Sequence, residues 1–368
     1  MDFPLPVAEA IALASLTTLG VGGPARYLAR CSNARELIDC LAVARDRGLE
    51  TFLLGGGSNL LVADRGFDGL VVRLTDETLI FEPAAGKVLV RAGAGMEWDR
   101  LVERTAAADL GGLECLSGIP GRVGAAPIQN IGAYGQEVSE TIAAVHAVAL
   151  ATGERRSLPG ADCGFGYRHS HFKGRWRDRY AVVGVDFLLE RRREGAVRYP
   201  DLRRRFEDRE GTGAVPTLTE VREAVLAIRR GKSMVLDPAD PNRRSAGSFF
   251  VNPTVTPEVA REVRERLEPP GAEPADRMPA FPAAGGRVKI AAAWLIERAG
   301  FPRGYRLGRA AISTRHALAL VNTGRATAAE IVALASRIRR GVRDACGVRL
   351  EPEPVFLGFD AGVDELLD

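Results

Sequence analysis

Two glycine-rich segments in the first half of the chain have the composition of an anion-binding site. The first is Gly-Gly-Gly-Ser-Asn, from Gly55 to Asn59, between two short apolar runs. The second runs from Gly118 to Gly135 and consists mostly of small residues. Consecutive small residues let backbone N–H groups converge on an anion and let the chain approach a ligand closely. A diphosphate would suit such loops, although one such loop alone is as often a tight turn between strands.

Two other glycine motifs lack the context that nucleotide binding requires. The stretch from Gly20 to Ala25 has the spacing of a dinucleotide-binding turn, but no strand precedes it and Pro24 opens no helix. Gly231-Lys232-Ser233 resembles the end of a P-loop, yet the position five before Gly231 is Leu226, inside a predicted helix. We expect neither a Rossmann site nor a Walker motif.

Capping residues and hydrophobic periodicity predict the elements that position the glycine segments. Asn33 and Glu36 open a helix that ends near Gly48, and a second helix is expected around Trp98 to Ala108. Strands are expected at 52–54, 60–62, 71–74, 88–91, 143–150 and 181–189. The middle of the chain is therefore a strand-rich α+β region.

The last third of the chain predicts a further compact α+β unit after a boundary near residues 210–230. Thr217 and Glu220 cap a helix to about Arg230, and Thr327 and Glu330 cap a long one with an apolar face. That face comprises Ile331, Leu334, Ile338 and Val342. A loop is expected at 269–286, a buried helix at 290–298, and strands at 317–321 and around Val348 and Val355.

Composition excludes several classes of protein. The 368 residues suffice for two or three domains, and the formal net charge of +3 is spread without a polybasic tail, so nucleic acid is not an expected partner. The five cysteines are scattered and the four histidines form no ligand-like cluster, so we expect neither disulfides nor a metal. With no long apolar run and no basic N-terminal leader, a cytoplasmic protein off the membrane is expected.

Six motifs, in the same order, resemble those of the UDP-N-acetylenolpyruvoylglucosamine reductase family. Any one of them is moderately specific, whereas six collinear ones over nearly the whole chain are highly specific. They are Thr17-Thr18-Leu19-Gly20-Val21-Gly22-Gly23, the run from Leu54 to Leu61, the run from Ser117 to Gly135, Tyr167-Arg168-x-Ser170-x-Phe172-Lys173, Ala246-Gly247-Ser248-Phe249-Phe250-x-Asn252-Pro253, and Leu350-Glu351-Pro352-Glu353.

The resemblance implies an α+β flavoenzyme of peptidoglycan synthesis. Two FAD-binding subdomains of the vanillyl-alcohol-oxidase type, 1–76 and 77–212, would precede a substrate-binding domain at 213–358 and a tail at 359–368. NADPH would reduce the FAD, which would pass the hydride to UDP-N-acetylenolpyruvoylglucosamine and yield UDP-N-acetylmuramate. NADPH and the UDP sugar are then the expected partners, and we expect a monomer.

The same resemblance assigns roles to residues of both glycine segments. Expected FAD-binding residues are Leu54, Gly55, Gly56, Gly57, Ser58, Asn59, Ser117, Gly118, Ile119, Pro120, Gly121, Gly124, Ala125, Gln129, Asn130, Gly132, Ala133, Tyr134 and Gly135. Expected substrate-binding residues are Tyr167, Tyr199, Lys232 and Asn252. The family's usual Lys-Leu-Pro-Asp-Pro run is here Lys232-Ser233-Met234-Val235-Leu236-Asp237-Pro238, a departure that weakens the carry-over for Lys232.

Three residues match the family's catalytic set, and the reaction explains why these types are needed. Hydride addition to an enolpyruvyl group leaves negative charge delocalised into the substrate carboxylate, which Arg168 and Glu353 would stabilise. Ser248 would protonate the adjacent carbon, a strongly basic centre that even a weak acid can serve. Taken singly, each has a plain alternative: a turn serine, one arginine among many, and a solvated acid.

Two other classes of protein compete with this interpretation. A flavin oxidase of the same fold, reoxidised by oxygen, would keep the glycine segments but has no need of Arg168, Ser248 and Glu353 together. A nonenzymatic protein that binds a flavin or a nucleotide sugar would not need Ser248. A purified protein that is colourless and cannot be reconstituted with FAD would argue against both enzyme interpretations.

Overall fold

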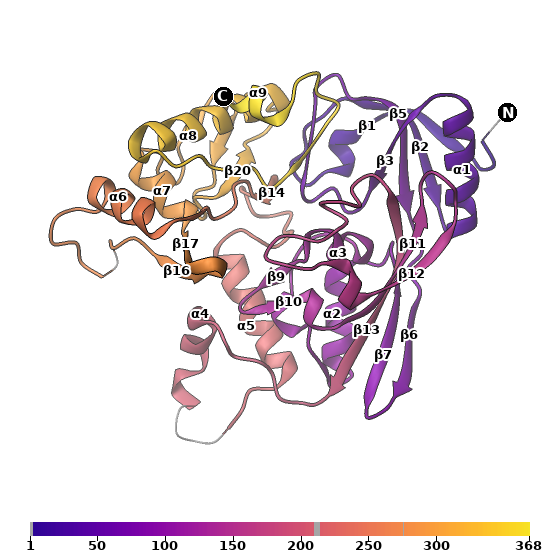
Figure 1. Ribbon diagram of the computed structural model, residues 1–368, viewed down its shortest axis with the longest axis horizontal. Coiled ribbons are helices and arrows are strands. Elements are labelled where there is room, and N and C mark those ends of the chain that lie inside the picture. The colour runs from indigo at the N-terminus through magenta and orange to yellow at the C-terminus, as the bar shows by residue number, and fades with distance from the viewer. Residues whose placement is uncertain (1–2, 210–213, 275) are drawn as a thin grey trace. The chain divides into compact units, whose positions relative to one another are not determined.

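The computed structural model describes residues 3–209, 214–274 and 276–368 (Figure 1). Its internal contacts divide the chain into two compact units, each assembled from three stretches. The first unit comprises Met1–Ile11, Ala25–Gly56 and Asp68–Leu236, and the second comprises Ala12–Pro24, Gly57–Phe67 and Asp237–Asp368. The expected boundary between 212 and 213 lies outside the described residues, and those after 76 and 358 stay predictions.

A four-stranded sheet of the first unit carries the first glycine segment. Its order is β1-β2-β5-β3, with β3 and β5 parallel, and α1 packs against it (Figure 1). As predicted, Asn33 begins α1, because its side chain accepts a hydrogen bond of 3.0 Å from the N–H of Glu36. The bounds are β1 Val7–Ala12, β2 Pro24–Cys31, α1 Ala34–Asp46, β3 Glu50–Leu54 and β5 Phe67–Leu74.

An antiparallel sheet forms the larger part of the first unit. Its order is β12-β11-β13-β7-β6, with β8 beside β13. The α2 residue Trp98 is buried against it, its ring centroid 6.1 Å from that of Phe187 on β13. The bounds are β6 Leu79–Ala84, β7 Lys87–Gly93, α2 Trp98–Ala107, β8 Leu110–Gly111, β11 Ile142–Ala149, β12 Arg155–Pro159 and β13 Tyr180–Arg191.

Short elements and one long helix complete the first unit. The second glycine segment forms neither a long helix nor a long strand, as predicted, but holds only α3 and β9 besides single 3-10 turns. Thr217 and Glu220 form the predicted capping box of α5. The bounds are α3 Ala126–Gln129, β9 Gly132–Ala133, β10 Gln136–Glu137, α4 Pro200–Arg203 and α5 Leu218–Gly231.

The second unit packs helices around three small sheets. The sheet orders are β14-β20-β19-β18, β15-β17-β16 and the parallel pair β21-β4. Thr327 caps α8 as predicted, and the predicted apolar face of α8 is buried in the core. The bounds are β4 Leu60–Val62, β14 Ser245–Ser248, β15 Thr254–Val255, α6 Pro257–Leu267, β16 Ala280–Ala283, β17 Arg287–Ile290, α7 Ala292–Arg298, β18 Arg306–Leu307, β19 Ala310–Ile312, β20 Ala319–Asn322, α8 Ala328–Cys346, β21 Val355–Leu357 and α9 Val363–Leu367.

Two local predictions in this unit are wrong. The segment 269–286 was expected to be a loop, but it contains β16, which pairs antiparallel with β17 through Phe281 and Lys289 despite its proline. Val348 was expected in a strand, but it lies in irregular chain after α8, which ends at Cys346 and is capped by Gly347. Pairing with a distant partner decides both cases, which local composition does not report.

No helix in the described part of the chain is both long and apolar enough to cross a membrane.

Candidate active site

In the first unit the two glycine-rich segments meet backbone to backbone. A Cβ added to Gly56 would lie 2.7 Å from Gly121 Cα, closer than side chains can approach, and one added to Gly55 would lie 3.4 Å from Ala125 Cβ. The N–H of Trp98 donates to the Gly121 carbonyl oxygen at 3.1 Å and holds this part of the second segment to α2. Segments far apart in sequence thus form one cradle of small residues.

Some backbone amides of the cradle are engaged within the protein. Gly124 N–H donates to the Ala94 carbonyl oxygen at 3.0 Å, and Gly118 N–H donates to an Asp99 carboxylate oxygen at 2.6 Å. Burial alone would raise the pKa of Asp99, but hydrogen bonds from Arg222 at 2.6 and 2.8 Å and from Gly118 outweigh burial and lower it. Gly118 and Gly124 therefore contribute close approach rather than free N–H donors.

Asn130 joins the second segment to the chain that follows it. Its carboxamide nitrogen donates to Glu137 at 2.8 Å and to the Gly166 carbonyl oxygen at 3.0 Å, while its oxygen accepts from Ser139 N–H at 3.1 Å. The residue is fully buried and adopts a left-handed backbone conformation, with φ of 48°. These contacts make Asn130 the residue that sets the shape of the loop.

Arg168 contacts the second glycine segment. Its Nη2 donates to the Gly132 carbonyl oxygen at 3.0 Å, and its guanidinium lies 5.8 Å from the centre of the exposed Tyr167 ring. The structure therefore brings a predicted catalytic residue onto a predicted cofactor segment within one unit.

The predicted substrate residues Tyr199 and Lys232 also adjoin this segment. The Tyr199 ring packs edge-on against Tyr134 at 5.7 Å between centroids, and it remains 41% exposed. Lys232, at the end of α5, places its Nζ 3.1 Å from a carboxylate oxygen of Asp201 on α4. An exposed aromatic ring and a partly exposed ammonium group suit a nucleotide sugar.

Arg229 is the residue of this region that sequence reasoning missed. Its side chain is 8% exposed, and its Nη2 donates to the Met234 carbonyl oxygen at 2.7 Å. Its Nε is buried with no hydrogen-bond partner among the described residues, and a Cβ on Gly118 would lie only 3.3 Å from it. Burial lowers the pKa of Arg229. The helical spacing of Val221, Val225 and Arg229 was the available signal.

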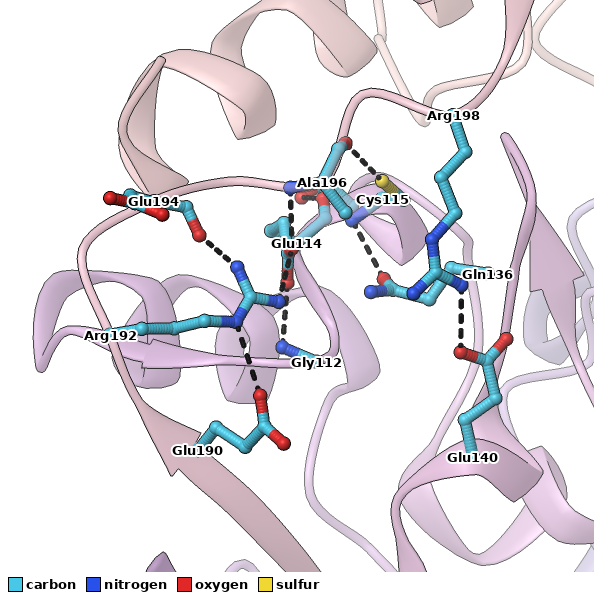
Figure 2. A network of polar contacts seen from close by, with 11 residues as sticks. Gly112, Glu114, Cys115, Gln136, Glu140, Glu190, Arg192, Glu194, Ala196 and Arg198 are labelled. Carbon is cyan, nitrogen blue, oxygen red and sulfur yellow. Dashed lines mark hydrogen bonds and ion pairs between the residues drawn. The ribbon is translucent and has the colours of Figure 1, made fainter. Parts of the chain in front are cut away.

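A buried carboxylate fixes the chain just before the second glycine segment (Figure 2). Glu114, 1% exposed, accepts hydrogen bonds from Gly112 N–H at 2.7 Å and from Ala196 N–H and Arg192 Nη2 at 3.0 Å each. Its backbone oxygen accepts from the Ser117 hydroxyl at 2.7 Å. Glu114 thereby connects the start of that segment to the irregular chain at Ala196, which leads to Tyr199.

The remainder of the first glycine segment belongs to the second unit. Gly57 has a φ of 64°, and an added Cβ would collide with the Leu16 carbonyl oxygen, so glycine is required there for the local fold itself. The Asn59 carboxamide nitrogen donates to the Glu353 carbonyl oxygen at 3.2 Å, and Asn59 in turn accepts from Val355 N–H at 3.0 Å. Asn59 thus lies beside a predicted catalytic residue.

Backbone pairing in the second unit joins Glu353 to the residue that follows Ser248. Glu353 N–H donates to the Phe249 carbonyl oxygen at 2.8 Å, and Phe250 forms an antiparallel bridge with Pro352. Phe249 and Phe250 are both 1% exposed, which anchors the pairing in the core. The Asn252 side-chain oxygen accepts from Ala292 N–H at 2.9 Å, where it caps α7.

Known proteins resemble this chain along nearly its full length. A curated relative from Thermobifida fusca, named UDP-N-acetylenolpyruvoylglucosamine reductase, is 49% identical over 95% of this chain and 98% of its own. Another of the same name, from Saccharopolyspora erythraea, is 47% identical over 94% of each. The chain belongs to the UDP-N-acetylenolpyruvoylglucosamine reductase family.

Domain models and a solved structure agree with this family. Residues 25–158 match an FAD binding domain, and residues 238–357 match the C-terminal domain of UDP-N-acetylenolpyruvoylglucosamine reductase. The crystal structure of the Thermus caldophilus reductase has a TM-score of 0.64 and 29% identity, over 96% of this chain and 99% of that one. The predicted α+β fold, an FAD-binding unit followed by a substrate-binding domain of this family, is confirmed.

The residues of the first unit fit FAD. The Gly55–Gly56 and Gly121 cradle leaves no side chain where a diphosphate would need backbone approach. The buried, unpartnered Nε of Arg229 needs an acceptor, and both phosphate and flavin carbonyl oxygens are acceptors. Among the described residues no three His, Cys, Asp or Glu side chains gather as metal ligands.

Gly55→Ala tests the cradle with the least disturbance. The added methyl group meets only Ala125 Cβ at 3.4 Å, so the protein should fold with its melting temperature within about 2 °C of the parent. Because the methyl group blocks backbone approach, FAD affinity should fall roughly tenfold or more. Flavin titration measures this, with Gly362→Ala, which faces open space, as control. Unchanged FAD affinity in a folded Gly55→Ala protein would remove Gly55 from the site.

Glu114→Gln tests the buried carboxylate. The variant keeps the size of the side chain but loses its charge and one of its two acceptor oxygens. Its free energy of unfolding should therefore be about 3 kcal/mol lower than that of the parent. Glu190→Gln, an exposed partner of the same Arg192, should change stability by less than about 0.5 kcal/mol. Urea denaturation compares the two. Equal stability of both variants would show that the network is dispensable.

The same residue predicts a pH dependence of stability. Burial alone would raise the pKa of Glu114, but hydrogen bonds from Gly112 and Ala196 and the charge of Arg192 lower it overall. The stabilisation that the ionised Glu114 carboxylate gives the folded protein is therefore complete above the pKa of an unfolded glutamate, about 4.3. It is lost as the pH falls through the lower pKa of Glu114 in the folded protein. Urea denaturation from pH 7 to 3 should show less acid loss in Glu114→Gln than in the parent.

Proposed function

We propose that this chain catalyses the NADPH-dependent reduction of UDP-N-acetylenolpyruvoylglucosamine to UDP-N-acetylmuramate, a step of peptidoglycan precursor synthesis. The observation that carries the proposal is the hydrogen bond of Glu353 N–H to the carbonyl oxygen of Phe249, the residue after Ser248, in a chain whose other unit holds Arg168 on the second glycine segment. The names of the relatives supply the substrate. The cytoplasmic location and the monomeric state expected from the sequence stay predictions.

The cofactor-binding residues would contribute in two ways, through close approach at the glycines and through the buried guanidinium of Arg229. FAD, when bound, would accept a hydride from NADPH and deliver it to the enolpyruvyl group. Gly55, Gly56 and Gly121 would admit the diphosphate, while Arg229 would donate its unpartnered Nε–H to an oxygen of the cofactor. Asn130 would hold the loop in its binding shape.

Arg168 and Glu353 would stabilise the charge that develops on the substrate. After hydride addition to the terminal carbon, the electron pair spreads into the substrate carboxylate, where a guanidinium is a strong partner. Glu353 would assist in its protonated form, as a hydrogen-bond donor. The contact of Arg168 Nη2 with the Gly132 carbonyl oxygen orients the guanidinium from one side.

Ser248 would deliver the proton that completes the reaction. A hydroxyl is a weak acid, but the receiving carbon is strongly basic, and one positioned donor needs no bulk water. The end of β14 is suited to this task, since Gly247 takes a φ of 75° and a register shift between Ser245 and Ser248 re-aims the strand.

Four residues would hold the UDP sugar. Tyr199 and Tyr167 present exposed rings, and Lys232 presents an ammonium group suited to a diphosphate. Asn252 would contribute its carboxamide nitrogen, because its oxygen already caps α7.

Anaerobic half-reactions test the proposal as a whole. The yellow protein should be bleached by NADPH, and UDP-N-acetylenolpyruvoylglucosamine should then restore the flavin absorbance with one equivalent of UDP-N-acetylmuramate formed. Reoxidation by oxygen alone, with the enolpyruvyl compound inert, would indicate an oxidase instead. A protein that binds flavin but is not reduced by NADPH would indicate a nonenzymatic binding protein.

Ser248→Ala should separate the two half-reactions. Loss of a positioned acid costs about 10²–10⁴ in rate, so reoxidation by the enolpyruvyl substrate should slow by that factor while reduction by NADPH stays within a few-fold. Ser248→Cys should recover part of the rate, because a thiol also donates a proton. Stopped-flow absorbance measures both steps, with Ser245→Ala from the same strand as control. Reoxidation of Ser248→Ala within a few-fold of the parent would refute the assignment.

Arg168→Ala should affect the same half-reaction for a different reason. Without the guanidinium the charge on the substrate carboxylate is unsupported, so reoxidation should slow by roughly 10²–10³, with FAD content and NADPH reduction nearly unchanged. Arg175→Ala, which removes a guanidinium that lies over the Trp176 ring, is the matched control. Equal slowing of both half-reactions would mean that Arg168 acts only through the structure of the Gly132 loop.

A further inference from the structure

A histidine lies against the hydroxyl of Ser248. His316 Nε2 is 3.4 Å from Ser248 Oγ, and it is the one histidine of the second unit's sequence. His146, by contrast, belongs to the first unit, where its Nε2 is 3.0 Å from a carboxylate oxygen of Asp186. The catalytic chemistry described above does not use His316.

Backbone hydrogen bonds hold the turn that carries His316 next to Ser248. Ser248 pairs with Ala319 in the β14–β20 ladder, and Phe249 N–H donates to the Leu318 carbonyl oxygen at 2.7 Å. The turn that carries His316 is closed by Ala319 N–H on the His316 carbonyl oxygen at 3.1 Å.

A second brace holds the other side of the same turn. The side chain of Asn242, 5% exposed, accepts from Thr314 N–H at 3.0 Å and donates to the Thr314 hydroxyl at 3.1 Å. Two strands and a braced turn therefore place the backbone of His316 within side-chain reach of Ser248.

The direction of the hydrogen bond matters because a serine hydroxyl has a single hydrogen. If that hydrogen were donated to His316, it would not be available to a substrate. If Nε2–H donates to Oγ instead, the hydroxyl hydrogen is free to point elsewhere. The second arrangement is the one that a proton donor requires.

We propose that His316 is a positioning residue and proton relay for Ser248, an inference that rests on the proposed function. As the Ser248 Oγ–H bond breaks and its proton joins the substrate carbon, the electron pair of that carbon forms the new C–H bond. In concert, His316 in its imidazolium form passes the proton of Nε2–H to Oγ, so no alkoxide accumulates and a neutral imidazole remains. The neutral imidazole then regains a proton from water. An imidazolium with a pKa near 6.5 is a far stronger acid than an alcohol.

Single-turnover reoxidation of the reduced holoenzyme by the enolpyruvyl substrate tests the relay. His316→Ala should slow this step about 10²-fold and leave FAD content and NADPH reduction unchanged, and added imidazole should restore part of the rate. His316→Gln should be as slow as His316→Ala, since an amide donates a hydrogen bond but not a proton. Full rescue by glutamine would overturn the relay. His146→Gln is the control histidine.

A double-mutant comparison gives a sharper result. A thiolate is a stable product of proton donation, because a cysteine has a pKa near 8.5. In a Ser248→Cys background, His316→Ala should therefore change the rate by less than about threefold. An equally large effect of His316→Ala in both backgrounds would show that His316 supports the fold of the turn and does not supply a proton.

A readout independent of turnover follows the hydrogen itself. Nitrogen-15 NMR of the histidine side chains in the holoenzyme should show hydrogen on Nε2 of His316, identified by its loss in His316→Gln, and Ser248→Ala should shift that resonance. A His316 ring with hydrogen only on Nδ1 would overturn the proposal. Failure of the proposed function looks different, because Ser248→Ala would then reoxidise at the parent rate whatever His316 does.

Discussion

The backbone contact between Gly56 and Gly121 underlies the geometry of the first unit. Any side chain at Gly56 would separate the loop after β3 from the second glycine segment. Gly121 is in turn held by Trp98, and the next residue of α2, Asp99, holds Gly118 and pairs with Arg222 of α5. One close approach thus links a parallel sheet edge, a loop and two helices, which explains why the loop keeps its shape without long secondary structure of its own.

Buried charges in this unit divide into two kinds. The buried carboxylate of Glu114 accepts hydrogen bonds from two backbone N–H groups and an arginine, and the partly buried carboxylate of Asp99 accepts from one backbone N–H and an arginine, so both hold the chain around them in place. Arg229 differs, since its Nε is buried beside the glycine cradle and has no hydrogen-bond partner in the part of the chain that the structure describes. Because an unsatisfied buried donor is costly, such a group is better explained by a ligand than by stability.

The second unit positions its reactive side chains through the main chain. Ser248 ends one strand, Glu353 N–H binds the carbonyl oxygen of the next residue, Phe249, and His316 lies on the turn that precedes the partner strand. Hydrogen bonds between backbones are short and directional, and the buried pair Phe249 and Phe250 anchors them in the core. Small polar side chains can then be placed without being buried themselves.

The sequence by itself determined the local features and the family. Capping residues such as Asn33, Thr217 and Thr327 act within a few positions, and six collinear motifs sufficed for the resemblance. Tertiary structure alone decided the rest: that Gly56 meets Gly121, that Glu353 binds the backbone of Phe249, that Arg229 and His316 lie at these places, and that 280–283 is a strand. Those outcomes depend on contacts between residues that are distant in the chain. Local sequence patterns do not contain the energy of such contacts and therefore cannot predict them.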